Sequence, residues 1–283
     1  MDTPVEQPAI ATEGRLLSLD ALRGFDMFWI IGGGTIVSGL GKGLNCEWFN
    51  LHVLPQTRHV AWEGFTAWDL IMPLFLFMVG TAMPFSFGKR LGRGETKGRL
   101  FAHVLYRVVV LWILGMVAQG RLLEYDLAQL RLYSNTLQAI AAGYLIASIL
   151  LLTLRPRWQF AVTAGLLLAY WGLMMLVPVP GQGVGRLTED GNLAIYLDKL
   201  ILGRFQDGTA YTWILSSMTF ATTVMMGAFA GRLLRSSGTK WQKVVVLLCS
   251  GLACVLVGWA WGFVFPIIKI GRASCRERVY HPV

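Results

Sequence analysis

The segment HVAWEGFTAWDLIMPLFLFMVGTAMPFSFGKR, His59–Arg90, decides how the rest of the chain is interpreted. Its apolar run, 67–87, is about 21 residues long, enough for a helix to cross the roughly 30 Å hydrocarbon core of a bilayer. One acid, Asp69, interrupts this run, and His59 precedes that acid by ten positions. A carboxylate inside a membrane helix is costly and needs a partner or a wet cavity, so Asp69 is a candidate site residue.

The composition places the whole chain among membrane proteins. Of its 283 residues, 55% are hydrophobic and 14% are charged, whereas soluble domains carry about 25% charged residues. Seven apolar runs have the length of a membrane helix, at 19–40, 67–87, 100–119, 137–154, 160–179, 213–230 and 244–268. We therefore predict an all-α, polytopic bundle of about seven transmembrane helices.

The charge pattern predicts the orientation of the bundle. Basic residues gather in the connections 88–99, 155–159 and 231–243, and the alternate connections are poorer in net positive charge. The positive-inside rule then places the N-terminus and the basic connections in the cytoplasm and the loop with His59 outside. This rule also explains the net charge of +9, so we expect no nucleic-acid partner.

No metal site is expected, because the four cysteines have neither the spacing of a zinc site nor that of a disulfide framework.

The first predicted span contains three charged residues, Asp20, Arg23 and Asp26. Their spacing of three allows Arg23 to pair with either acid on a helix. Two interpretations stay open: an ion-paired network that locks this helix against its neighbours, or a polar lining for a substrate tunnel. The triple glycine 32–34 indicates either close helix packing or a break in the helix.

Two further polar residues, Asn135 and Gln138, stand at the start of the fourth predicted span. Asn135 has the position of a helix cap. The predicted topology puts both residues near the same face as His59, so they are also candidates for lining a site there.

Taken together, these motifs resemble the heparan-α-glucosaminide N-acetyltransferase family of transmembrane acyltransferases and its bacterial relatives. The matching pieces are RLLSLDALRGFDM (Arg15–Met27), the triple glycine, HVAWEGFTAWDLIMPLFLFMVG (His59–Gly80) and SNTLQAIAAGY (Ser134–Tyr144). They occur in the family's order, and the resemblance covers most of residues 15–269.

The resemblance implies an enzyme that takes acetyl groups from cytoplasmic acetyl-CoA and passes them to a sugar or glycan acceptor outside. It also implies an integral, multi-pass location, which we expect to be the inner membrane of a bacterium. In the family a histidine takes part in the transfer and precedes a W-x-G-x-T-x-x-D pattern. Here that pattern corresponds to His59, Trp62, Gly64, Thr66 and Asp69.

The family often has asparagine where this chain has Glu63, which leaves open the part that Glu63 plays as a lining residue next to Trp62.

The resemblance also divides the chain. Residues 1–18 form a cytoplasmic N-terminal segment, and residues 19–269 form the transmembrane acyltransferase-like domain. Family members continue with further membrane helices beyond the region of Lys269. From 270 to 283 the chain reads IGRASCRERVYHPV, which looks like a translated sequencing-adapter oligonucleotide. We therefore expect a non-native tail and an incomplete domain.

Acyl transfer assigns a role to several of these residues. Imidazole is a base that works near neutral pH, which suits His59. Asp69 would orient that ring, but a continuous helix would separate the two by about 15 Å, so a bend near Gly64 is required; Arg23 is an alternative partner for Asp69. An oxyanion needs hydrogen-bond donors, and the candidates are Asn135, Gln138 and Arg23.

The phosphates of coenzyme A would be attracted by the basic connection with Lys89, Arg90 and Arg93, although membrane topology already explains these charges.

A transporter or permease for a small polar solute is the alternative function. Its motivation is the charge and the glycine interruption in the first span, as in carriers with broken helices. The oligomeric state, a homodimer included, stays open at this stage.

Overall fold

A computed structural model describes residues 17–44, 46–60, 62–119, 130–189, 191–206 and 211–268. The expected tail, 270–283, and most of the expected N-terminal segment lie outside these residues. Within the described ranges the chain is helical, and its β-structure is limited to two isolated bridges.

The helices occur in the order expected for a bundle. They are α1 (Leu17–Phe28), α2 (Gly34–Leu44), α3 (Glu47–His52), α4 (Ile71–Gly92), α5 (Lys97–Ala118), α6 (Thr136–Thr153), α7 (Pro156–Leu176), α8 (Leu193–Leu202), α9 (Ser217–Arg235) and α10 (Lys240–Trp261). Short 3₁₀ turns lie at Leu54–Thr57 (η2), Ala67–Leu70 (η3) and Gly203–Phe205 (η4), and a π-helical turn, η1, occupies Trp29–Gly33.

The predicted class, a helical membrane bundle, is confirmed, but a count of seven spans is not. Among the described residues, five helices are long and apolar enough to cross a bilayer: Ala67–Gly92 (η3 with α4), α5, α6, α7 and α10. The first predicted span is divided into α1 and α2, which have 12 and 11 residues. The remaining predicted span corresponds to α9, a 19-residue helix with several threonines and two arginines.

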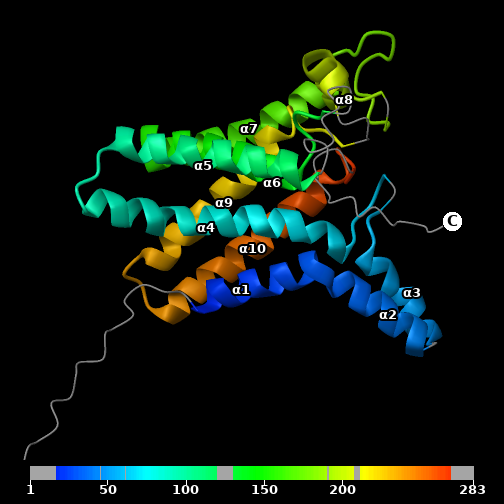
Figure 1. The fold of residues 1–283 in the computed structure, drawn as a ribbon, viewed down its shortest axis with the longest axis horizontal. Coiled ribbons are helices and arrows are strands. Elements are labelled where there is room, and N and C mark those ends of the chain that lie inside the picture. The colour runs from blue at the N-terminus through cyan, green and yellow to red at the C-terminus, as the bar shows by residue number, and fades with distance from the viewer. Residues whose placement is uncertain are drawn as a thin grey trace, which may run out of the picture.

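The triple glycine both breaks the first helix and allows close packing. The π-helical turn η1 separates α1 from α2, and Gly32 within it has non-helical dihedral angles. At Gly34, a Cβ atom would lie 2.6 Å from the ring of Trp68. The bend between α1 and α2 is visible in Figure 1. It brings Trp29 edge-to-face with Trp68, with ring centroids 6.3 Å apart.

The closest helix pair in the core is α4 with α9. A Cβ atom at Gly80 would lie 1.9 Å from the carbonyl oxygen of Val224, and one at Gly227 would lie 2.0 Å from that of Phe77. Small residues let two helix backbones approach in this way, and the gain is van der Waals contact along the whole pair. α6 packs against the same pair, and α5 packs on α6 and adds Leu100, Val104 and Val108 to the main hydrophobic core.

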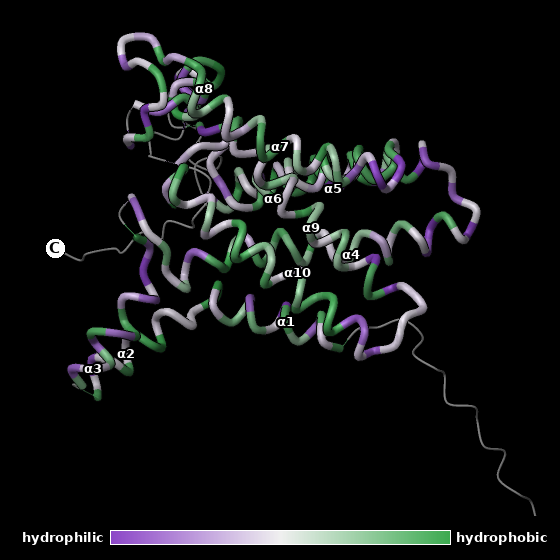
Figure 2. The backbone as a smooth tube through the Cα atoms, turned by 180° about the vertical axis from the view of Figure 1, so that it is seen from behind, coloured by the Kyte–Doolittle hydropathy of each residue, from purple (hydrophilic) through white to green (hydrophobic). Residues whose placement is uncertain are grey.

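The two ends of the bundle carry different connections. The α4–α5 and α9–α10 connections lie at one end, and α3 and α8 lie at the other (Figure 1). Lys97 Nζ donates to the carbonyl of Leu152 at 3.2 Å, which places the end of α6 with the first group. Hydrophilic positions gather in the connections at both ends (Figure 2). We call the end with 88–99, 155–159 and 231–243 the basic end, and the opposite end the histidine end.

Candidate active site

His59 and Asp69 are in direct contact at the histidine end. His59 Nδ1 lies 2.8 Å from Asp69 Oδ1. The side chain of Asp69 is 1% exposed and that of His59 is 19% exposed, so one edge of the imidazole remains reachable. The bend that the sequence requires is present: Gly64 has φ +116°, a conformation that favours glycine, and η3 begins three residues later.

The carboxylate of Asp69 is held on its other side by Thr66. Asp69 Oδ2 accepts from the backbone N–H of Thr66 at 3.1 Å and lies 3.0 Å from the Thr66 hydroxyl. Thr66 and Asp69 together form a capping box at the start of η3. These contacts point Oδ1 at the imidazole. An ionised Asp69 accepts a hydrogen bond from the Nδ1–H of His59, and in that tautomer Nε2 carries the lone pair of the imidazole.

The other side of the imidazole faces an aromatic wall. The rings of His59 and Trp68 meet edge-to-face with centroids 6.2 Å apart. Trp68 in turn borders a cavity of about 260 Å³ between α1, η2, η3 and the start of α4, which Phe25, Asp26 and Trp29 also line. Trp68 therefore contacts both His59 and this cavity.

Asp26 is an unusual member of that cavity lining. It is 1% exposed, and among the described residues neither carboxylate oxygen has a hydrogen-bond partner. Arg23 pairs instead with Asp20, at 3.5 Å, on a partly exposed face of α1. Among the described residues, the predicted ion pairing of Arg23 is therefore seen with Asp20 and not with Asp26. Whether Asp26 lines a substrate tunnel stays a prediction.

A second cavity, of about 340 Å³, follows the first toward the basic end. Arg23 lines it from α1, Arg107 from α5 and Tyr144 from α6, and the α4 positions that line it, from Phe75 to Phe87, succeed those of the first cavity. The Arg107 guanidinium lies over the Tyr144 ring, 5.2 Å from its centroid. The two cavities thus lie in order along α1 and α4 between the basic end and His59.

Trp62 and Glu63 connect the histidine segment to distant parts of the chain. Trp62 Nε1 donates to the carbonyl of Leu187 at 3.0 Å, and the exposed Glu63 forms a β-bridge with Ile268. Neither residue lines the two cavities described above. Their observed contacts hold the backbone around Gly64 in place.

Asn135 and Gln138 form bonds within their own segment. Asn135 caps α6 by accepting from the N–H of Leu137 at 2.8 Å, which is the capping role predicted for it. The fully buried Gln138 donates to the carbonyl of Leu132 at 2.8 Å and accepts from the N–H of Ser134 at 2.9 Å. These bonds order the entry to α6, and an oxyanion role for either amide stays a prediction.

The predicted coenzyme-binding residues lie at the basic end. Lys89 and Arg90 belong to the last turn of α4, and Arg93 is its C-cap. Arg90 lies 3.4 Å from Glu95 and 3.0 Å from His103 Nε2. Within the described residues, no group of three or more His, Cys, Asp or Glu side chains has a metal-binding arrangement.

The fold and this site define a class: a polytopic helical membrane protein with a histidine–aspartate pair at one end of its bundle. Comparison with known proteins is more specific. The chain is 24% identical over 311 aligned residues to the human protein "Heparan-alpha-glucosaminide N-acetyltransferase", covering 93% of this chain and 43% of that protein. It is 23% identical over 258 residues to the mouse protein of the same name, covering 75% of this chain and 38% of that protein.

These similarities support the heparan-α-glucosaminide N-acetyltransferase-like family that the motifs indicate. The chain spans less than half the length of either relative. No protein-family model matches the sequence.

Proposed function

We propose that the chain is part of a membrane-bound acetyltransferase that moves an acetyl group from acetyl-CoA to an amino sugar or glycan. The observation that carries this proposal is the His59–Asp69 contact of 2.8 Å, at the end of a helical membrane bundle. The two relatives, both named as N-acetyltransferases, support the reaction class.

In the proposed step, Nε2 of His59 acts as general base. It takes a proton from the acceptor amine as the amine nitrogen attacks the thioester carbonyl; the new C–N bond forms, and the C–S bond breaks to release the coenzyme A thiolate. Asp69 stabilises the imidazolium that forms, and the proton then passes to the thiolate. A route through acetyl-histidine differs in having two half-reactions, and ping-pong kinetics would reveal it.

The donor is proposed to approach from the basic end. Lys89, Arg90 and Arg93 would attract its phosphates, and the two cavities along α1 and α4 offer an approach toward His59, with Arg23 and Asp26 as polar lining. In this orientation the basic end and the N-terminus are cytoplasmic and the histidine end is extracytoplasmic, in agreement with the positive-inside rule. The acceptor would then bind outside, next to the imidazole.

A transporter is the second candidate, because the break between α1 and α2 at η1 is a feature of carriers with discontinuous helices. Proteoliposomes with the intact protein distinguish the two functions. Acetyl-CoA supplied on one side and glucosamine on the other should yield N-acetylglucosamine, and no product should form without acetyl-CoA. Accumulation of unmodified glucosamine, independent of acetyl-CoA, would instead identify a transporter.

A further inference from the structure

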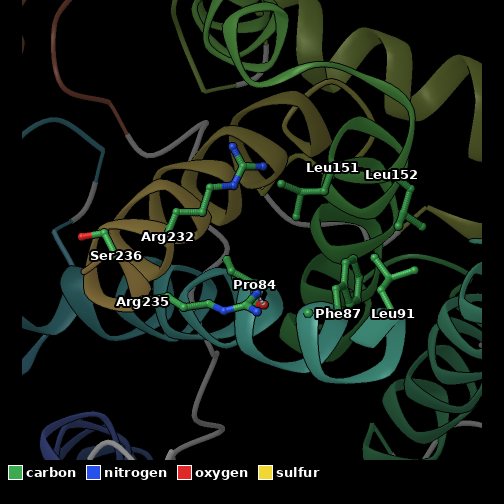
Figure 3. Close-up of a pocket in the computed structure, with 9 residues that line it drawn as sticks. Pro84, Phe87, Leu91, Leu151, Leu152, Arg232, Arg235 and Ser236 are labelled. Atoms are coloured by element: carbon green, nitrogen blue, oxygen red, sulfur yellow. Dashed lines mark hydrogen bonds between the residues drawn. The ribbon is translucent and has the colours of Figure 1, made fainter. Parts of the chain in front are cut away.

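A third cavity lies at the basic end, where α4, α6 and α9 finish. Its volume is about 470 Å³. Phe87 and Leu91 of α4 and Leu151 and Leu152 of α6 form apolar walls. Arg232 and Arg235 of α9 also line the cavity (Figure 3). None of the described residues that line it is acidic. It thus combines an apolar wall with two guanidinium groups.

Both guanidinium groups are fixed in position. Arg235 Nη1 donates to the carbonyl of Pro84 at 2.9 Å, and Arg232 donates to the side-chain oxygen of Gln159. At Gly88 a Cβ atom would lie 1.8 Å from Arg235 Nη1, so the space that Arg235 occupies exists because residue 88 has no side chain. A guanidinium has five N–H donors, so one bond each leaves donors for a ligand.

The charge around the cavity favours an anion. Each helix C-terminus contributes about half a negative charge, and basic side chains near such ends often bond the last carbonyls. Lys97 and Lys243 have this ordinary role, with the carbonyls of Leu152 and Leu234. The net charge of this end is nevertheless positive, because the three connections of the basic end hold eleven lysines and arginines and one acid, Glu95.

We propose that this cavity binds the phosphate of an amphiphilic anion, with Arg232 and Arg235 on the phosphate and the apolar walls against its chain. The occupant is an anionic glycerophospholipid of the surrounding bilayer. The three helices end here, which is the level of the lipid headgroups, and basic pockets between membrane helices at this level suit such headgroups. The site is separate from His59, and the proposal does not depend on acetyl transfer.

The test uses the intact protein, purified in a neutral detergent and titrated with dioctanoyl-phosphatidylglycerol or dioctanoyl-phosphatidylcholine, with bound lipid counted by native mass spectrometry. We expect tighter binding of phosphatidylglycerol. Arg232→Gln and Arg235→Gln should each weaken it about tenfold, since each loses a hydrogen bond between two charged groups. Gly88→Ala should weaken it as well, because it displaces the Arg235 guanidinium without removing its charge.

Arg157→Gln is the matched control, because Arg157 lies exposed at the basic end and does not line the cavity. If Arg157→Gln weakened phosphatidylglycerol binding as much as the cavity variants do, the net positive charge of the basic end would explain the binding, and the proposed site would be overturned. Equal binding of the two lipids would overturn it too. Competition by coenzyme A at the same concentration as the lipid would overturn the lipid as occupant and assign the phosphate to a nucleotide.

Discussion

Replacing Asp69 with asparagine changes the charge beside His59 while keeping the size of the side chain. In the structure Asp69 Oδ1 faces His59 Nδ1 at 2.8 Å, and Oδ2 accepts from the N–H of Thr66 at 3.1 Å. An asparagine oxygen must take the place of Oδ2, because an amide NH₂ there would oppose the Thr66 N–H. The NH₂ group then faces Nδ1, so Nδ1 becomes an acceptor and Nε2 carries the proton. The imidazole can no longer accept a proton from the acceptor amine.

The size of the effect follows from the step that is lost. General-base catalysis contributes about 10²–10⁴-fold to a rate, which corresponds to about 2.7–5.4 kcal/mol of barrier. The cost in stability is smaller, because the bond to Thr66 is kept and the loss of a carboxylate near a helix N-terminus costs about 0.3–1 kcal/mol. We therefore expect a large fall in kcat with a small fall in Tm.

The assay measures transfer from radiolabelled acetyl-CoA to glucosamine by membranes that contain the intact protein, together with Tm in detergent. Glu47→Gln is the control, because Glu47 is an acid in the first turn of a helix, α3, outside the site. It should leave kcat unchanged. An unchanged kcat in Asp69→Asn would refute the role of the carboxylate, and an equal loss of Tm and activity would indicate unfolding.

The remaining predictions concern backbone and buried groups. Gly64→Ala should lower acetyl transfer, because φ is +116° at this bend, whereas Gly94→Ala, at φ +83° in the α4–α5 connection, should affect Tm alone; a normal rate in the first variant would contradict this. Asp26→Leu should raise Tm in thermal unfolding, because it removes a buried carboxylate that has no hydrogen-bond partner among the described residues, and a fall in Tm would reveal a partner. Gly80→Ala should lower stability by about 1–3 kcal/mol through overpacking against α9, whereas Gly172→Ala, within α7 and with open space around it, should not lower stability in the same measurement.

The long apolar helices are the part of the fold that the sequence predicts well. The predicted spans 100–119 and 137–154 differ from α5 and α6 by one to three residues at each boundary. Long apolar runs make such boundaries predictable, because a chain in lipid must form its backbone hydrogen bonds within the helix. The first span is different: hydropathy is continuous across 19–40, and only the triple glycine signals the break at η1.

The candidate site is partly predictable for the same kind of reason. The buried Asp69 needs a polar partner. His59 can be that partner only if the chain bends near Gly64, because a continuous helix would hold the two side chains apart. The choice of Arg23 between two acids could not be predicted, because both lie three positions away. The hydrogen bond from Trp62 to Leu187 could not be predicted either, since the two residues are 125 positions apart in the chain. The contact of Trp68 with His59 likewise depends on the tertiary fold.

The central claim is that the imidazole of His59 performs the proton transfer of an acetyltransferase. The most direct test compares the intact wild-type protein with its His59→Ala variant, after a check that the two have the same Tm. The measured quantity is labelled N-acetylglucosamine formed from acetyl-CoA and glucosamine in membranes. The account predicts a loss of about 10²-fold or more in His59→Ala. Product formation at the wild-type rate would contradict it.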